Sequence, residues 1–372
     1  MNASLRWLAQ SGGLAPRAGW APALRRYGVL IAFVALLIAM IVGSPSFLSL
    51  RNFFNILSQW TPVGIMAVGA TYVILAGGFD LSAASGFALC AVVTALLATR
   101  FGLPPEIDFL ASLVVGIGIG AINAFLVVVL KINPFIATLG SGFVLNGVPF
   151  VIVTDPFINV QQPGFDTLGV GSWHGFPYAV MLLIGLFVIA GIVLAKTPYG
   201  QRIYAVGGNP ETSRLFGIRV SWVIASTYIF SGFCMGAAAA VGTSQLNYSS
   251  NEQDPALIFN VIVAVVVGGT SLSGGFGSIW RTAVGLGILA IMQNGLNLLE
   301  VNAFSQYIVK RFIILAAVGF DGWMRFLASS AQRRNQPTHT APPVSGPDDG
   351  AKPERQPLAF PVRGVATRGL AR

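Results

Sequence analysis

The sequence of 372 residues is poor in charge and in histidine. Only 9% of its residues are charged, 2 are histidine and 54% are hydrophobic. Soluble domains are about a quarter charged, whereas the apolar residues of this chain form runs of about 20, the length of a bilayer crossing. These runs lack the alternating pattern of a membrane β-barrel. The composition therefore predicts an all-α membrane protein, a polytopic helical bundle.

The motifs of common catalytic sites are also missing. The chain contains no GxxxxGK[ST] P-loop, no HExxH and no GxSxG. Its histidines, His174 and His339, fall outside every expected span, so an intramembrane hydrolase has no histidine base. Cys90 and Cys234 both lie in apolar runs and imply no disulfide framework. We expect no catalytic residue, no cofactor and no metal site in this chain.

Ten apolar segments are expected to cross the membrane as helices. They are 27–43, 59–77, 81–99, 109–130, 135–153, 177–195, 222–242, 256–270, 281–298 and 304–320. With the N-terminus in the cytoplasm, the inner segments hold eighteen basic residues and the outer segments only Arg51 and Arg100. Since basic residues concentrate on the cytoplasmic side, both termini are predicted inside, and the net charge of +9 reflects orientation rather than nucleic-acid binding.

The two ends of the chain differ in composition from its middle. Residues 1–26 are predicted to form a cytoplasmic N-terminal segment, and residues 27–325 a transmembrane domain. Residues 326–372 are polar, basic and rich in proline, a composition that cannot bury a core. We expect a disordered cytoplasmic tail there.

Glycine-rich stretches interrupt several apolar segments. "GGFDLS" at 77–82 recurs as "GGTSLS" at 268–273, after a short apolar segment in each case. Such pairs indicate either broken helices near a substrate path or plain turns at the membrane face. "GIGIG" at 116–120 lies inside an apolar run and predicts close packing between helices.

Polar residues within the apolar segments suggest a path for a neutral, hydroxyl-rich solute, because lipid offers them no hydrogen-bond partner. Asp80 either caps the helix that begins near Leu81 or contacts the solute. Lys310 and Arg311 are expected to snorkel or to bind carbonyl groups. Most uncharged polar residues are expected to join helices; they are Asn123, Asn133, Thr138, Ser141, Asn146, Asn260, Gln293, Asn294 and Asn297. The candidate residues of the substrate path are Asp80, Ser82, Asn146, Ser273 and Asn294.

The stretch "GGNPETSRLFGI" at 207–218 predicts a short, well-ended helix between two apolar runs. Asn209 suits the N-cap, Pro210 the first helical position, Glu211 the positive helix end and Gly217 the C-terminal turn. A helix of about two turns is too short to be stable alone in water. We expect a partner surface to cover its apolar residues.

Four stretches together resemble the membrane subunit, or permease, of ribose-type sugar ATP-binding-cassette (ABC) importers. They are "GGFDLSAASGFALCAVVTALL" at 77–97, "NPFIATLGSGFVLNGV" at 133–148, "TPYGQRIYAVGGNPETSRLFGI" at 197–218 and "AVVVGGTSLSGGFGSIWRTAVGLGILAIMQNGLNLL" at 264–299. The resemblance covers roughly residues 30–325.

This resemblance implies a multi-pass permease subunit in a bacterial inner membrane. Its implied partners are a cytoplasmic ABC ATPase, a periplasmic sugar-binding protein and a second permease subunit, in a homo- or heterodimer. Residues 196–221 correspond to the family's coupling loop, although Thr212 and Ser213 replace the alanines of its usual pattern. The implied coupling residues are Gly207, Gly208, Asn209, Pro210, Glu211, Arg214, Leu215, Phe216 and Gly217. The alternative is an ion-coupled secondary transporter, which favours acidic residues or histidine in several spans.

Overall fold

The computed structural model describes residues 33–44, 47–252, 254–302, 305, 306, 308 and 312. All of them belong to one compact unit, Met1–Gly322. The predicted terminal segments, Lys310 and Arg311, and most of the expected span 304–320 lie outside the described residues. The predictions made for them therefore stay predictions.

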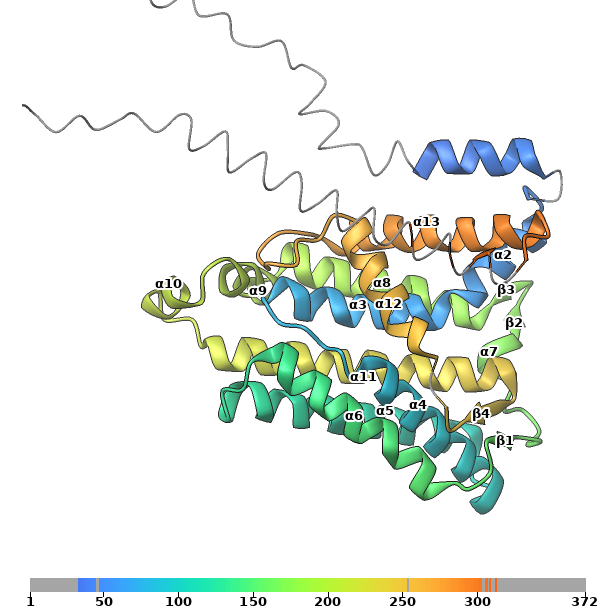
Figure 1. Cartoon of the computed structure of the whole chain (residues 1–372), viewed down its shortest axis with the longest axis horizontal. Helices are drawn as coiled ribbons and strands as arrows, with labels where there is room; N and C mark the ends of the chain where they lie inside the picture. The colour runs from blue at the N-terminus through green and yellow to red at the C-terminus, as the bar shows by residue number, and fades with distance from the viewer. Residues whose placement is uncertain are drawn as a thin grey trace, which may run out of the picture. The chain divides into compact units, whose positions relative to one another are not determined.

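The described residues are mainly helical (Figure 1). Before the first strand lie the helix Phe33–Gly43, α2 (Leu50–Gln59), α3 (Thr61–Leu75), α4 (Ala83–Leu96), the π-helix η1 (Leu97–Phe101), α5 (Pro105–Ala124), the π-helix η2 (Phe125–Val129) and α6 (Pro134–Ile152). There follow β1 (Phe157–Asn159), α7 (Thr167–Val170), β2 (Ser172–Trp173), β3 (Phe176–Pro177), α8 (Tyr178–Lys196), α9 (Pro198–Gly208), α10 (Pro210–Leu215), α11 (Val220–Leu246), β4 (Tyr248–Ser250), α12 (Pro255–Val267) and α13 (Ile279–Leu298).

The helices confirm the predicted class of all-α membrane protein. Five of the described helices are long and apolar enough to cross a membrane: Ala83–Phe101, Pro105–Val129, Pro134–Ile152, Tyr178–Lys196 and Val220–Leu246. Shorter apolar helices occupy Phe33–Gly43, Thr61–Leu75 and Ala256–Val267. Each of the first nine expected spans thus overlaps a helix that the structure describes. The count of ten crossings and the position of both termini stay predictions.

Several helices begin at a capping residue followed by proline. Asn133 accepts a hydrogen bond from the Phe135 N–H ahead of Pro134, and Thr197 accepts one from the Gly200 N–H ahead of Pro198. Proline fits the first helical turn because its missing N–H has no partner there, and the capping side chain satisfies one of the free N–H groups that remain. The sequence therefore fixes the start of these helices locally.

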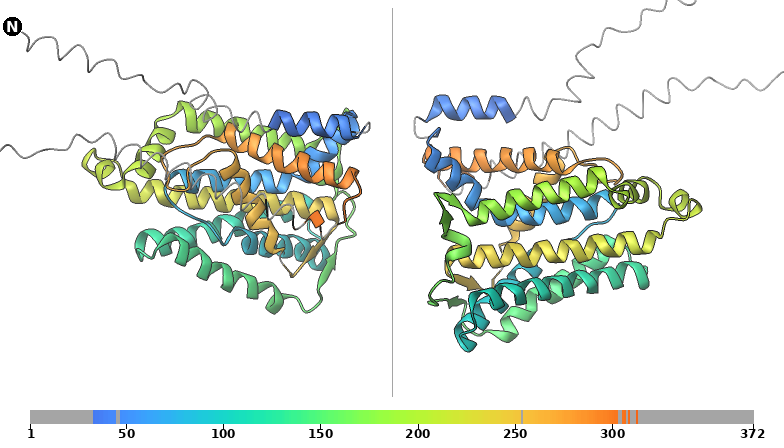
Figure 2. Two further views of the ribbon diagram at one scale, coloured as in Figure 1. Left: turned by 45° about the horizontal axis from the view of Figure 1, so that its top comes forward. Right: turned by 180° about the vertical axis from the view of Figure 1, so that it is seen from behind.

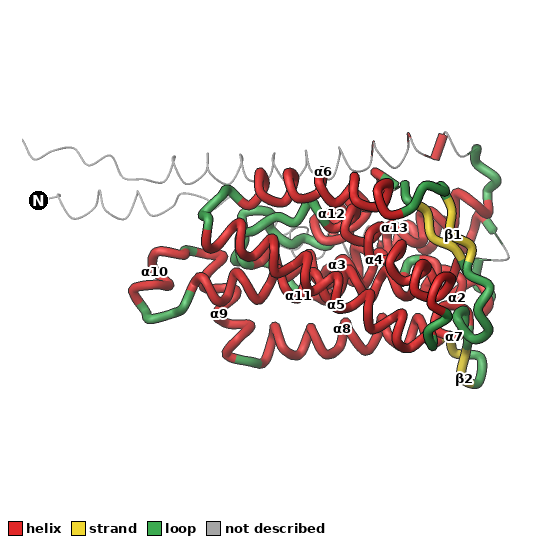
Figure 3. The backbone as a smooth tube through the Cα atoms, turned by 90° about the horizontal axis from the view of Figure 1, so that it is seen from below, coloured by secondary structure: helices red, strands yellow, loops and turns green. Residues whose placement is uncertain are grey.

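Helix α11 lies in the middle of the bundle and packs against α3, α4 and α5. The long helices run alongside it in all the views (Figures 1 and 2). Helices α9 and α10 lie at one end, which we call the α10 end, and the short strands lie at the other, which we call the β end (Figure 3). At the β end, β1 pairs with β4 in antiparallel register, so that the loop after α6 meets the loop after α11.

The "GIGIG" stretch packs α5 against α11, as predicted. Gly116 faces the backbone of Gly232 and Gly236, and Gly120 faces the backbone at Tyr228. Neither glycine has room for a methyl group, whereas Gly118 of the same stretch points into open space. The absence of side chains lets the two helix backbones approach closely, which is how small residues join helices in membranes.

Replacement of Gly120 by valine is expected to destabilise the folded protein by about 3 kcal/mol, because the added side chain meets backbone that cannot move aside. Gly118→Val is the matched control, since its side chain projects into open space on the same helix. Thermal unfolding in detergent measures both variants. Equal unfolding midpoints in the two variants would contradict this packing.

The two related Gly-rich stretches connect their helices differently. Residues 76–82 cross α11 on the way from α3 to α4, as the connection in Figure 1 shows. Residues 268–278 return the chain from α12 to α13, which pack directly against each other. Gly77, the first glycine of its copy, and Gly269, the second glycine of its copy, have a positive φ of 85° and 90°, so the glycine turn comes one residue later in the second copy. The paths that follow the two turns also differ.

Candidate functional site

Helix α10 has the ends that its sequence predicts. The Asn209 Oδ1 accepts a hydrogen bond of 2.9 Å from the Thr212 N–H, and Pro210 occupies the first turn. At the other end Gly217 has φ 77°, its N–H binds the Arg214 carbonyl, and the Ile218 N–H binds the Ser213 carbonyl. These two hydrogen bonds satisfy carbonyl groups that the helix end leaves free. The predicted short helix is confirmed as Pro210–Leu215.

Two large apolar side chains stand out from the tip of this helix. Leu215 is 88% exposed, the highest value among the exposed large hydrophobic residues of the described chain, and Phe216 is 82% exposed. Glu211 and Arg214 form an ion pair of 2.7 Å on the same helix, but both are largely exposed, so the pair adds little stability. An apolar pair held on a capped helix outside the bundle is suited to a protein partner.

A cleft of about 750 Å³ lies beside α10, between α9 and the start of α11. Its lining includes Phe216 and Trp222 as well as Arg202 and Arg219. The one salt bridge among the described residues is that of Glu211 and Arg214, so both cleft arginines are available to an outside group. The cleft combines apolar walls with positive charge and suits a protein segment that carries acidic side chains.

Helix α9 is anchored to the bundle by two tyrosines. The Tyr199 hydroxyl and the Ser226 Oγ of α11 are 2.8 Å apart, and the Tyr204 hydroxyl donates to the Gly277 carbonyl at 2.9 Å. Burial raises the pKa of Tyr199 and of Tyr204, so both keep the proton that such bonds require. The helix thus sits firmly between the bundle and α10.

The nine residues predicted for coupling lie close together in the structure, as expected from their nearly continuous stretch of sequence. Gly207 is half-buried in the last turn of α9, and the other eight residues are exposed. The eight are Gly208, Asn209, Pro210, Glu211, Arg214, Leu215, Phe216 and Gly217. They form one surface at the α10 end, and their role in coupling stays a prediction at this point.

A second candidate region is a buried polar network at the first Gly-rich break. Asp80 and Ser82, both predicted for the substrate path, are 8% and 0% exposed. The Asp80 Oδ1 accepts hydrogen bonds from the Ser82 Oγ and N–H, at 2.6 and 3.2 Å, and its Oδ2 accepts one of 2.8 Å from the Ser231 Oγ of α11. Since the Ser82 N–H lies just before α4, the carboxylate holds the start of that helix.

The network continues into α5 and α6. The Asn123 Nδ2 donates to the Ser82 Oγ at 2.7 Å, and the Ser141 Oγ donates to the Asn123 Oδ1 at 2.6 Å. The Phe79 carbonyl next to Asp80 accepts from the Thr138 Oγ1 and from the Tyr228 hydroxyl. The break is therefore tied to three helices, and the prediction that such polar residues join helices is confirmed for Asn123, Thr138 and Ser141.

Sequence reasoning did not single out two members of this network, Ser231 and Tyr228. Both lie within the apolar run of α11, and no local motif marks them. The available signal was their polarity in an apolar helix, which they share with other serine and tyrosine residues of the chain.

The remaining substrate-path candidates lie elsewhere. Asn294 of α13 exchanges two hydrogen bonds, of 3.0 and 2.9 Å, with Asn52 of α2. Asn146 is half-buried on α6, and Ser273 is exposed in the loop 268–278. The structure thus brings together Asp80 and Ser82 only, and the substrate path formed by all five residues stays a prediction.

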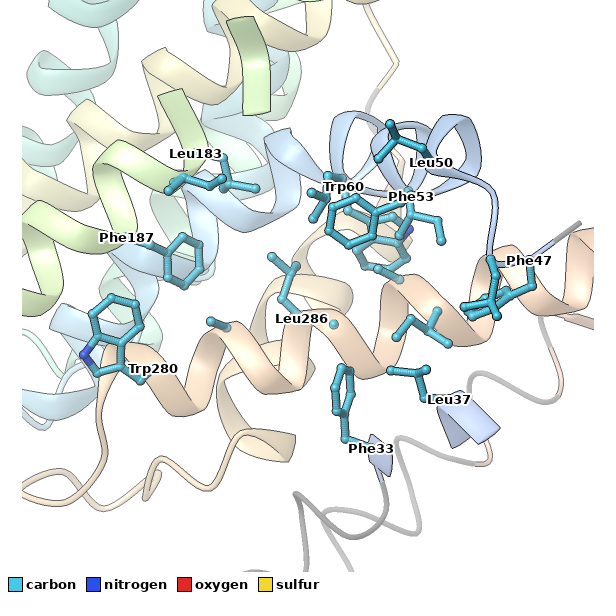
Figure 4. A pocket seen from close by; sticks show the side chains of 18 of the residues that line it. Phe33, Leu37, Phe47, Leu50, Phe53, Trp60, Leu183, Phe187, Trp280 and Leu286 are labelled. Carbon is cyan, nitrogen blue, oxygen red and sulfur yellow. The ribbon is translucent and has the colours of Figure 1, made fainter. Parts of the chain in front are cut away.

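A cavity of about 620 Å³ lies between the helix Phe33–Gly43, α2, α8 and α13 (Figure 4). Its walls are aliphatic and aromatic, with Trp60, Phe187, Trp280 and Leu286 among them. Such a lining suits hydrocarbon and gives few donors or acceptors to a hydroxyl-rich solute. This cavity does not match the solute path that the polar residues suggest.

The apolar helical bundle, with an exposed apolar pair at the α10 end, is that of an integral membrane protein, and its buried polar side chains are a feature of transporters. The family of the permease component of branched-chain amino acid transport systems matches residues 52–318. The chain belongs to this permease family and is a transport permease, not an enzyme.

Characterised relatives are similar over most of their length. The chain is 36% identical to the ribose import permease protein RbsC of Bacillus subtilis (strain 168), over 80% of this chain and 93% of that protein. It is 32% identical to the L-arabinose transport system permease protein AraH of Escherichia coli (strain K12), over 80% and 90%. The ribose import permease protein RbsC of the same E. coli strain is 36% identical over 78% and 92%. No solved structure matches the chain.

Proposed function

We propose that this chain is the membrane-spanning subunit of an ATP-driven importer for a monosaccharide or a related polyol. The observation that supports an ATP-driven mechanism is the exposed pair Leu215 and Phe216 on the capped helix α10. A separate ATPase covers this pair, and a second permease subunit and a sugar-binding protein complete the importer.

Relatives support a sugar as the solute. The family description refers to branched-chain amino acids, whereas the similar relatives carry the names of ribose and L-arabinose permeases. The amides and hydroxyls near the first break bind one another in this conformation, so the support for a sugar comes from the relatives.

The orientation proposed for the chain places the α10 end in the cytoplasm of a bacterial cell, with ten crossings of the inner membrane. The basic residues Lys196, Arg202, Arg214 and Arg219 lie at this end, in or next to α9 and α10. The acidic residues Asp155, Asp166, Glu252 and Asp254 lie in the loops at the β end. This asymmetry agrees with the positive-inside rule.

The mechanism follows from this orientation. ATP binding closes the ATPase subunits, which shift α10, and the helices reorient between inward-open and outward-open states. Sugar released by the binding protein then enters a central path, and hydrolysis resets the cycle. The permease itself supplies the path and the docking helix, and the free energy comes from its partner.

Vesicle uptake tests the proposal directly. The purified permease, reconstituted with its ATPase and binding protein, is expected to take up labelled ribose or L-arabinose only with ATP, and to leave labelled leucine outside. Uptake by the permease alone, driven by an ion gradient, would favour an ion-coupled secondary transporter. Uptake of leucine instead of sugar would keep the importer and overturn the proposed solute.

Replacement of Phe216 by aspartate is expected to reduce co-purification of the ATPase by roughly tenfold, since exposed aromatic side chains at the centre of an interface supply much of its binding energy. Trp173→Asp is the matched control, because Trp173 is also an exposed aromatic residue, 62% accessible, but lies at the β end. If both variants retain the ATPase equally, α10 is not the docking helix.

A further inference from the structure

Both Gly-rich breaks meet the end of α9, the helix that leads directly into α10. The contact involves Gly77 of the connection 76–82 (the first break), Gly207 of α9, and Gly274 and Gly275 of the connection 268–278 (the second break). We call this contact the glycine junction. Residues from three distant parts of the sequence thus share one position in the fold. The sequence singled out residues 77–82, 207–218 and 268–273 separately, but neither Gly274 and Gly275 nor the meeting of the three stretches.

The junction is built from backbone against backbone. The Gly275 N–H donates a hydrogen bond of 2.9 Å to the Leu75 carbonyl, which joins the second break to the end of α3. Gly207 packs onto that same carbonyl and onto the Gly275 N–H, with no room for a methyl group. A methyl group on Gly274 would lie 2.9 Å from both the Gly207 carbonyl oxygen and the Gly77 Cα. Because these backbone contacts are closely packed, one segment cannot move far without moving the others.

A side-chain contact holds the same loop to α9. The Tyr204 hydroxyl donates to the carbonyl of Gly277, three residues after Gly274. On the other side, the first break runs from Gly77 to Asp80 in three residues, and Asp80 binds Ser82 and Ser231. The junction therefore connects α9 to the buried polar network through a short, packed segment of chain.

We propose that the glycine junction transmits the movement of α10 to both breaks at once, so that α9, residues 75–80 and residues 274–277 shift as one body. This proposal rests on the proposed function, in which an ATPase moves α10. It assigns to the glycine junction the transfer of that movement from α10 to the solute path. Gly207 and Tyr204 act as positioning residues, since each acts through the breaks and not on the solute.

Two glycine-to-alanine variants, one in α9 and one in α8, provide the test. Gly207→Ala is expected to lower the sugar transported per ATP hydrolysed by about tenfold, because the added methyl group separates α9 from the Leu75 carbonyl. Gly185→Ala on α8 is the matched control, since Gly185 is not a predicted coupling residue and a methyl group there meets no atom within 4 Å. ATPase co-purification is expected to stay unchanged in both, because the exposed face of α10 is intact. Equal transport per ATP in the two variants would overturn the proposal.

Substitutions of the two tyrosines of α9 change the packing less than Gly207→Ala does. They test the proposal if the Gly207→Ala variant does not assemble with its partners. Tyr204→Phe removes only the hydroxyl that holds the second break, and Tyr199→Phe removes one that binds α11. We expect a loss of about threefold in transport per ATP for Tyr204→Phe alone, the size of one hydrogen bond. Identical ratios in the two variants would again overturn the proposal.

Failure of the junction and failure of the proposed function give different results. If the ATPase is not needed, uptake proceeds without nucleotide in every variant. If α10 couples but the junction does not transmit, Phe216→Asp loses the ATPase and uptake, while Gly207→Ala keeps the transport per ATP of Gly185→Ala.

Discussion

Gly217→Val is expected to reduce ATP-driven sugar uptake by at least about tenfold while the transmembrane helices stay folded. Gly217 has φ 77°, a conformation that a β-branched residue adopts only at a cost of about 1–3 kcal/mol. Open space surrounds the position, so the effect comes from the backbone and not from a collision. The six-residue helix α10 ends at this turn and has little else to hold its shape, so the strain moves Leu215 and Phe216 away from the ATPase.

Thr212→Val is the control for Gly217→Val. Thr212 is exposed on the same helix and valine has nearly its shape, so the helix and its apolar pair keep their positions. Uptake in vesicles and ATPase co-purification are measured on both variants, with the thermal unfolding midpoint as the check on folding. If Gly217→Val transports like Thr212→Val, the turn at Gly217 does not determine coupling. Glu211→Lys is expected to have a smaller effect, because the ion pair that it breaks is exposed to solvent.

The ends of α10 were predictable because every group that fixes them lies within ten residues. Asn209 binds the N–H three positions ahead, and Gly217 closes the last turn through the Arg214 carbonyl. Helix α9 was not predicted, although Thr197 and Pro198 carry the same cap-and-proline signal as Asn209 and Pro210. Its apolar residues are too few to form an apolar run, and contact with the bundle supplies the rest of its stability.

Long-range contacts account for what the sequence did not reveal. Ser231 reaches Asp80 across 151 residues and Tyr228 reaches Phe79 across 149, so no local pattern links them. The two Gly-rich copies look alike in sequence, yet one crosses α11 and the other returns as a hairpin, because their flanking helices pack on different neighbours. The pairing of β1 with β4 likewise depends on where α6 and α11 end.

The candidate substrate path shows the same limit. Polarity marks residues that need a partner, but it does not say whether the partner is solute or protein. Asn294 meets Asn52, and Asn123 meets Ser82 and Ser141, so protein partners satisfy these amides in this conformation. A residue of this kind contacts solute only if transport breaks its protein contact, which is a property of the cycle and not of the sequence.

Asp80→Ala is expected to destabilise the folded permease by about 3 kcal/mol or more, because it leaves the Ser82 Oγ, the Ser82 N–H and the Ser231 Oγ without their common acceptor. The first break then loses its attachment to α11, and transport is expected to fall with the unfolding midpoint. Asp80→Asn keeps an acceptor oxygen for Ser82, and the Ser231 hydroxyl can turn to accept from the amide, so most of the stability returns.

The Asp108→Asn variant serves as a control. It shows whether Asp80→Ala destabilises the protein through its lost hydrogen bonds or only through the loss of a buried carboxylate. Asp108 of α5 is also fully buried, but neither of its carboxylate oxygens has a hydrogen-bond partner within the described part of the chain. An amide there is easier to bury than a charge, so the unfolding midpoint is expected to stay the same or to rise. Thermal unfolding of the three variants in one detergent ranks them. If Asp80→Ala and Asp108→Asn unfold at the same temperature, the three hydrogen bonds of Asp80 do not hold the first break in place. Another contact must then fix the position of the first break at the glycine junction.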